Sequence, residues 1–335
     1  MAVAGPRNLI TDVPGLLVGQ AEDHACLTGT TVVLAESPAV AAVDVRGGAP
    51  GSRETELLGP ANSVYRVDAI VLSGGSAFGL DAAGGVMDWL AEHGRGFAVR
   101  DQLVPIVPAA ILFDLAFPGR RKWAGEPPYR RLGRAAIEAA GPQFALGNAG
   151  AGLGAKAGRL KGGIGSASLR LADGTMVGAL VAVNSRGSVV RPDCGRLWTA
   201  ELALPGEIDP QPVLPDGPVD PEDLSADADT GAGENTTIAV VATDAPLGRN
   251  GCRRFAIMAQ DGLARAIRPA HTPFDGDTVF ALATGSGPPV DAERLSRLGS
   301  VAADCLSRAI MRAVTEAAPL GGFPSWRQRW GVGRA

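Results

Sequence analysis

Two adjacent threonines, Thr236 and Thr237, lie at the junction of two very different segments. Residues 205–234 before them are rich in Pro, Asp, Glu and Gly, and residues 236–244 are rich in Val, Ile and Thr. The first composition is typical of a flexible arm and the second of a buried strand. A hydroxyl at such a junction can attack the peptide bond between Asn235 and Thr236. That cut would give Thr236 a free α-amine.

The chemistry favours Thr236 because a hydroxyl needs a base before it becomes an effective nucleophile. The chain has only three histidines and no recognisable Ser-His-Asp order. An α-amine, with a reference pKa of about 7.7–8.0, is partly neutral near pH 7 and can accept the hydroxyl proton. We therefore predict that the chain cleaves itself between Asn235 and Thr236. Thr237 is the competing nucleophile. Neighbouring residues of a strand face opposite sides of the sheet, so only one of the two threonines can face the site.

Two acids separated by a glycine, Asp275 and Asp277, are the candidates for orienting the nucleophile. They can simply be turn residues that open the apolar segment 278–283. In the functional interpretation, one carboxylate accepts a hydrogen bond from the amine or hydroxyl of Thr236 and the other supports it. The Asp of a catalytic triad has this orienting role. A calcium site is not expected, because further oxygen ligands at loop spacing are missing.

Asn184, Ser76 and a glycine-rich segment could also line the site. Asn184 ends an apolar segment, where Asn is usually a turn residue, but its amide can also donate to an oxyanion. Ser76 follows a predicted buried strand in a glycine turn that nearly matches a nucleophile elbow, but Gly79 comes one residue late. Residues 147–168 lack the strand and helix of a dinucleotide loop. We expect this segment to pack closely beneath the site, with one cation pointing in.

Composition limits the classes of protein that this chain can be. It has 335 residues, of which 46% are hydrophobic, and a net charge of −4, so a basic nucleic-acid-binding surface is not supported. No apolar segment approaches the ~20 residues that span a bilayer, and no signal peptide is recognised. The four cysteines are far apart and contain no CxxC pair, which indicates reduced thiols. We expect a soluble, cytoplasmic protein without metal or cofactor that binds neither nucleic acid nor membranes.

Apolar periodicity and turn signals predict alternating strands and helices in a single domain, with the arm at residues 205–235 as its one internal boundary. Helices are predicted at residues 80–92, 132–140, 252–268 and 295–317. Strands are predicted at residues 16–19, 30–34, 40–45, 67–72, 104–112, 164–171, 176–184, 236–244 and 278–283.

Five separated motifs resemble the DmpA-type peptidase family, which includes D-Ala-releasing aminopeptidases, β-peptidyl aminopeptidases and nylon-oligomer (6-aminohexanoate oligomer) hydrolases. The motifs follow the family's order over nearly the whole chain. They lie at residues 44–48, 150–152, 161–163, 233–238 and 275–278.

The resemblance implies an α/β fold, a four-layer αββα sandwich like that of N-terminal-nucleophile hydrolases with different strand connectivity. It implies self-cleavage into an α chain, residues 1–235, and a β chain, residues 236–335. It also implies a homo-oligomer of αβ units, often a tetramer. The implied substrates are small peptides or ω-amino-acid amides.

Matching motifs carry the family's site residues onto this chain. Thr236 would be the nucleophile, and Asn184 would assist oxyanion stabilisation. Asp275 and Asp277 match the acidic pair of the nylon-oligomer branch, whereas the aminopeptidase branch has Ser and Glu.

The chain departs from the family's pattern at two positions. The active-site Lys is expected where this chain has Arg159, and Arg stays charged and cannot act as a base. Either Arg159 is purely electrostatic, or Lys161 or Lys156 replaces it. A pocket Tyr appears here as Phe113, which keeps the shape but loses a hydroxyl donor.

Three alternatives remain open at this stage. An acyltransferase of the glutamate N-acetyltransferase type would prefer an amine acceptor to water. A non-catalytic binding protein would stay in one piece. A hydrolase with Ser76 as nucleophile would keep its activity without Thr236.

Overall fold

The computed structural model describes residues 2–208, 211–215, 219 and 235–331. Most of the predicted arm, with Gly233 and Glu234 of the cleavage motif, lies outside the described residues.

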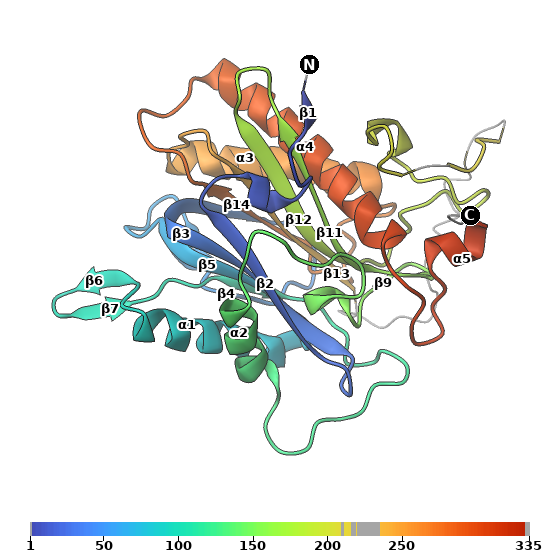
Figure 1. The fold of residues 1–335 in the computed structure, drawn as a ribbon, viewed down its shortest axis with the longest axis horizontal. Helices are drawn as coiled ribbons and strands as arrows, with labels where there is room; N and C mark the ends of the chain where they lie inside the picture. The colour runs from blue at the N-terminus through green and yellow to red at the C-terminus, as the bar shows by residue number, and fades with distance from the viewer. Residues whose placement is uncertain (1, 209–210, 216–218, 220–234, 332–335) are drawn as a thin grey trace.

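A ten-stranded sheet forms the centre of the molecule (Figure 1). Its strands are β1 (Val3–Ala4), β2 (Leu16–Asp23), β3 (Thr28–Val45), β4 (Ser52–Arg53), β5 (Arg66–Ser73), β8 (Ala109–Ile111), β11 (Gly163–Arg170), β12 (Met176–Asn184), β13 (Thr236–Thr243) and β14 (Thr278–Ala283). The strand order is β1-β11-β12-β13-β14-β3-β5-β8-β4, and β2 pairs with β3 off this path.

The long strand β3 belongs to two layers of this sheet. Its first half pairs with β2 and β5, and its second half pairs with β14. The register with β5 shifts between Leu34 and Ala39, where the exposed residues 36–38 interrupt the buried pattern. The prediction of separate strands at 30–34 and 40–45 is therefore wrong, because an irregularity within one strand resembles a turn in the sequence.

Helices cover the outer face of each layer, which confirms the predicted αββα sandwich. Helices α3 (Arg249–Ala266) and α4 (Ala292–Thr315) pack on the layer that contains β11 to β14. Helices α1 (Ala82–Glu92) and α2 (Tyr129–Glu138) pack on the layer that contains β2 and β5. Figure 1 shows the two helix pairs on opposite sides of the strands.

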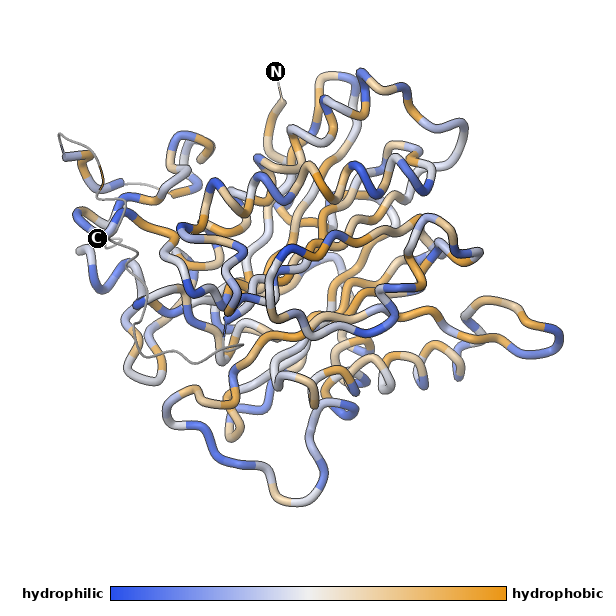
Figure 2. The backbone as a smooth tube through the Cα atoms, turned by 180° about the vertical axis from the view of Figure 1, so that it is seen from behind, coloured by the Kyte–Doolittle hydropathy of each residue, from blue (hydrophilic) through white to orange (hydrophobic). Residues whose placement is uncertain are grey.

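Three buried apolar clusters fill the three spaces between the four layers. The middle cluster joins side chains of both sheet layers, such as Ile70 of β5 with Val240 of β13 and Phe280 of β14. Figure 2 shows the most hydrophobic segments concentrated on the strands. Burial of both faces explains why these strands are nearly continuous apolar runs in the sequence.

One predicted strand is replaced by shorter elements. Residues 104–112 do not form a single strand, because the two prolines in this segment cannot donate to a ladder. Only Ala109–Ile111 joins the main sheet as β8. The beginning of the segment belongs to a separate hairpin of β6 (Phe97–Val99) and β7 (Gln102–Val104). The remaining short elements are β9 (Lys156–Ala157), β10 (Leu160–Lys161) and α5 (Trp326–Trp330). None of the helices in the described residues has the length and apolar character needed to cross a membrane.

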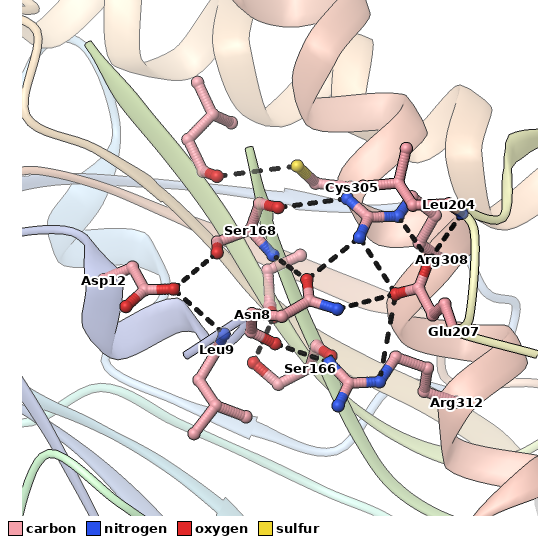
Figure 3. Close-up of polar contacts among 12 residues, drawn as sticks. Asn8, Leu9, Asp12, Ser166, Ser168, Leu204, Glu207, Cys305, Arg308 and Arg312 are labelled. Carbon is pink, nitrogen blue, oxygen red and sulfur yellow. Dashed lines mark hydrogen bonds and ion pairs between the residues drawn. The ribbon is translucent and has the colours of Figure 1, made fainter. Parts of the chain in front are cut away.

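A buried polar network connects Glu207, near the start of the predicted arm, to α4 (Figure 3). Arg308 of α4 donates two hydrogen bonds to the Glu207 carboxylate, at 2.9 and 3.0 Å. It also donates to the carbonyl of Ser168 at 3.0 Å and to the side chain of Asn8 at 2.9 Å. The Arg308 and Glu207 side chains are only 1% and 5% exposed. Each side chain therefore stabilises the charge of the other, since little water reaches either of them.

Replacing Glu207 by Gln should lower the free energy of unfolding by about 3 kcal/mol, because Arg308 would keep a buried charge without its counter-ion. Urea denaturation measures this change. The matched control is Glu293→Gln, which removes the exposed pair with Arg297 and should change stability by less than about 0.5 kcal/mol. Equal effects of the two substitutions would contradict the role assigned to the network.

Candidate active site

Several of the predicted site residues meet at one end of the central strands. Asn184, the last residue of β12, pairs with Thr236, the first residue of β13. Asn235 forms a parallel bridge with Asp275 in the loop that leads into β14. Sheet register thus brings together three segments that are far apart in the sequence.

The hydroxyl of Thr236 lies against the peptide bond that precedes it. It donates a hydrogen bond to the carbonyl oxygen of Asn235. The Gly276 N–H donates to the same carbonyl oxygen at 3.1 Å and also to the Thr236 Oγ1 at 3.2 Å. Asn235 is fully buried and Thr236 is 3% exposed. A hydroxyl, a carbonyl and a donor for that carbonyl are therefore in contact in a site shielded from water, where such donors are most effective.

Glycine at position 276 is what allows this close approach. A Cβ added there would lie 2.8 Å from the Thr236 Oγ1 and 2.8 Å from the carbonyl oxygen of Ala49. Any side chain would push against the Thr236 hydroxyl on one side and against backbone on the other.

Asp277 holds the backbone beside Thr236. Its Oδ1 accepts a hydrogen bond from the Thr237 N–H at 2.8 Å. Its Oδ2 accepts from the His271 backbone N–H at 3.0 Å and contacts the His271 Nδ1 at 2.9 Å. The carboxylate therefore orients the peptide that follows Thr236, rather than bonding to the Thr236 hydroxyl itself.

Asp275 accepts hydrogen bonds on the other side of the site. Its carboxylate accepts hydrogen bonds from the Arg186 N–H at 3.3 Å and from the Thr272 N–H and hydroxyl at 3.0 and 2.5 Å. Burial, and then the nearby charge of Asp277, raise the pKa of Asp275. Acids with a raised pKa are common in catalytic sites.

Asn184 connects Thr236 to the predicted pocket residue Phe113. Its Nδ2 donates to the Phe113 carbonyl at 3.1 Å, and its Oδ1 accepts from the Lys156 N–H at 3.0 Å. The Phe113 side chain is partly buried. These bonds fix the Asn184 amide next to the first residue of β13.

Arg159 and Lys161, two of the three candidates for an active-site cation, have opposite environments. The third, Lys156, is partly buried, and its Nζ lies 5.8 Å from the centre of the Phe323 ring. Arg159 is exposed and lines a surface cavity of about 160 Å³ with Arg329 and Trp330. Lys161 is fully buried, and its Nζ donates to the carbonyls of Gly152 and Gly162, both at 2.9 Å. The structure therefore brings Lys161 into the interior and leaves Arg159 at the surface.

Burial also changes the charge that Lys161 carries. Desolvation lowers its pKa to about 7, although the nearby carboxylate of Asp114 acts in the opposite direction. Burial raises the pKa of Asp114 itself to about 6. Lys161 is therefore partly neutral near neutral pH, as a proton-transferring residue needs to be.

Two groups of the site were missed by reasoning from the sequence. The Gly276 N–H and His271 belong to residues 271–277, of which only Asp275 and Asp277 were predicted to act in the site. The available signal was the His itself, six residues before Asp277 in a chain with three histidines. Ser76 begins the 3-10 turn Ser76–Asp81, and its N–H is bonded to the carbonyl of Leu112, the residue before Phe113.

Comparison with known proteins identifies the family. Residues 8–326 match the family model of peptidase family S58. The chain belongs to peptidase family S58. The S58 chain is therefore a hydrolase of peptide or other amide bonds, as its motifs predicted.

Relatives with curated names cover nearly the whole S58 chain. An uncharacterized aminopeptidase of Mycobacterium tuberculosis is 47% identical over 96% of this chain and 97% of the relative. A 6-aminohexanoate-oligomer endohydrolase of Paenarthrobacter ureafaciens is 33% identical over 92% of this chain and 86% of the relative.

Solved structures support the fold. The l-aminopeptidase d-ala-esterase/amidase of Ochrobactrum anthropi, described as a new variant of the Ntn hydrolase fold, superposes with a TM-score of 0.71 at 21% identity. The alignment covers 97% of this chain and 90% of that chain. A beta-aminopeptidase of Burkholderia sp. gives a TM-score of 0.70 at 24% identity, covering 99% and 94% of the two chains. The predicted likeness of the fold to that of N-terminal-nucleophile hydrolases is confirmed.

The lowered pKa of Lys161 predicts a pH dependence of stability. Between the folded pKa of about 7 and the ordinary value of about 10.5, the unfolded chain binds more protons, so stability rises with pH. The Lys161 contribution should grow by about 2 kcal/mol between pH 7 and pH 9. Asp114, whose folded pKa is about 6, is almost fully ionised in both states over this range and adds almost no slope.

Urea denaturation of the wild type and of Lys161→Met at both pH values measures this contribution. The wild type should gain about 2 kcal/mol more than the variant between pH 7 and pH 9. Parallel changes in the two proteins would mean that Lys161 titrates normally in the folded state.

Proposed function

We propose that this chain is a self-cleaving N-terminal-nucleophile amidohydrolase in which Thr236 is the nucleophile. The observation that carries the proposal is the contact of the Thr236 hydroxyl with the Asn235 carbonyl, which also accepts the Gly276 N–H. The hydroxyl is next to the bond to be broken, and the N–H is placed to stabilise the oxyanion that forms.

The proposed self-cleavage has two steps. The Thr236 oxygen attacks the carbonyl carbon of Asn235, the bond to the Thr236 nitrogen breaks, and that nitrogen leaves as an amine with the hydroxyl proton. Water then hydrolyses the resulting ester. This returns the hydroxyl to Thr236, leaves a carboxylate on Asn235 and produces the α-amine that serves as base in later turnovers.

In turnover, the Thr236 amine takes the proton of its own hydroxyl as the oxygen attacks a substrate amide. It passes the proton to the departing amine, and water hydrolyses the acyl-enzyme. Asp275 and Asp277 orient the loop and backbone around Thr236. Asn184, which pairs with Thr236 in the sheet, assists the oxyanion.

Lys161, rather than Arg159, is proposed as the active-site cation. Its burial and its pKa of about 7 support a role in charge stabilisation or proton transfer, and Arg159 is exposed. Lys161 immediately precedes the glycine that leads into β11, and β11 pairs with β12, which ends at Asn184.

The proposed substrates are short linear amides, either small peptides or ω-amino-acid amides. The aminopeptidase names of the 47% identical relatives favour the first class, and the acidic pair and the 33% identical oligomer endohydrolase favour the second. Membership of a peptidase family favours hydrolysis over the acyltransferase and binding-protein alternatives.

The proposal includes a homo-oligomer of αβ units, in which residues 1–235 form the α chain and residues 236–335 the β chain. The β6/β7 hairpin supports association, because a two-stranded hairpin is marginally stable alone. Its exposed apolar side chains are Phe97, Val99, Leu103 and Val104.

Thr236→Ala should remain a single uncut chain and lose amide hydrolysis by at least about a thousandfold, because it lacks the nucleophile. Thr236→Ser keeps a hydroxyl and should still cleave and turn over. The matched control is Thr237→Val, which keeps the shape of a side chain whose Oγ1 has no hydrogen-bond partner in the described structure. A denaturing gel and a peptide or 6-aminohexanoate-oligomer assay measure both effects. Cleavage or activity in Thr236→Ala would contradict the proposal.

Gly276→Ala should slow self-cleavage by about tenfold or more, because its Cβ would displace the Thr236 hydroxyl. The rate at which the full-length band disappears after synthesis measures this effect. The control is Gly141→Ala, where an added Cβ meets nothing within 4 Å. Equal cleavage rates in the two variants would contradict the proposed attack geometry.

A further inference from the structure

His271 is a partly buried polar residue of the site that the proposed chemistry does not use. Its backbone has a φ of 56°, a left-handed conformation that is uncommon for residues other than glycine. The side chain is 19% exposed. Such a conformation has a free-energy cost and persists where the surroundings require it.

The contacts of His271 show what this conformation achieves. Both its backbone N–H and its ring Nδ1 reach the same oxygen, the Oδ2 of Asp277, at 3.0 and 2.9 Å. The ring Nδ1 is therefore the donor, since a carboxylate only accepts. The other ring nitrogen, Nε2, is buried and has no hydrogen-bond partner in the described part of the chain.

Asp277 transmits this contact to the nucleophile. With Oδ2 held by two donors, its Oδ1 points at the Thr237 N–H, 2.8 Å away. That N–H belongs to the peptide group formed by the Thr236 carbonyl, so the carboxylate fixes the backbone on which the Thr236 hydroxyl is carried. Asp277 is 2% exposed, so water cannot replace a lost donor without entering the site.

We propose that His271 is a positioning residue for Thr236, acting through Asp277 in both self-cleavage and turnover. The ring N–H stops the carboxylate from rotating and offsets the repulsion from Asp275, whose pKa is raised in part by Asp277. This inference rests on the proposed role of Thr236. The inference predicts that both reactions need a hydrogen-bond donor at the position of the His271 Nδ1. They do not need the imidazole ring to carry a proton.

Two substitutions separate the donor from the ring. His271→Gly removes the side chain and accepts the left-handed backbone without strain. His271→Asn also tolerates this backbone, and its amide N–H can occupy the Nδ1 position. His271→Ala repeats the truncation if the Gly variant does not fold. The control is His24→Ala, at an exposed position remote in sequence from the site.

Turnover is measured per cut chain, and self-cleavage from the decay of the full-length band. In His271→Gly, kcat and the self-cleavage rate should fall about 10- to 100-fold, because a hydrogen bond to a charged group is lost. KM should stay within about twofold of the wild-type value. His271→Asn should recover both rates to within about threefold of the wild type, and His24→Ala should match the wild type.

Wild-type rates in His271→Gly would overturn the inference, and so would a His271→Asn variant as slow as the Gly variant. A rise in KM at constant kcat would also overturn it, because it would indicate a role in substrate binding. Thr236→Ala is assayed in parallel. If that variant hydrolyses substrate, the proposed function fails, whereas an inactive Thr236→Ala with a fully active His271→Gly rejects only the role of His271.

Discussion

The carbonyl oxygen of Asn235 accepts hydrogen bonds from the hydroxyl of the next residue, Thr236, and from the N–H of Gly276. Everything proposed for this S58 peptidase depends on that arrangement. It requires β13 to lie between β12 and β14 in one register, and it requires a residue without a side chain at position 276. The buried surroundings exclude water, so that the donors are not masked by solvent.

The fold explains how a cut at this place would leave the site intact. β13 pairs with β12 from the N-terminal part of the chain, and β14 pairs with β3. The two fragments would therefore share one sheet and its apolar clusters. The bond between Arg308 and Glu207 adds a buried link between them, close to the start of the arm. A new chain end at Thr236 would be held by the same neighbours that hold it in the continuous chain.

Much of the fold could be predicted from the sequence because buried strands and helices have periodic patterns of apolar residues. The strand at 278–283 and the hairpin of 164–171 and 176–184 were found nearly to the residue. The pattern failed within β3, where three exposed residues lie inside one strand. At the site, Arg159 and Lys161 are only two positions apart, and tertiary burial, which local sequence does not encode, separates them. The role of His271 likewise depends on its backbone conformation, and in the sequence this segment cannot be distinguished from an ordinary turn.

Intact-mass spectrometry of freshly purified, fully active protein, combined with N-terminal sequencing of each species, tests the central claim most directly. The account predicts two species, the smaller of which begins at Thr236 and has the mass of residues 236–335. A single species that begins at the original N-terminus and retains full activity would contradict it, because Thr236 would then have no α-amine to act as the base.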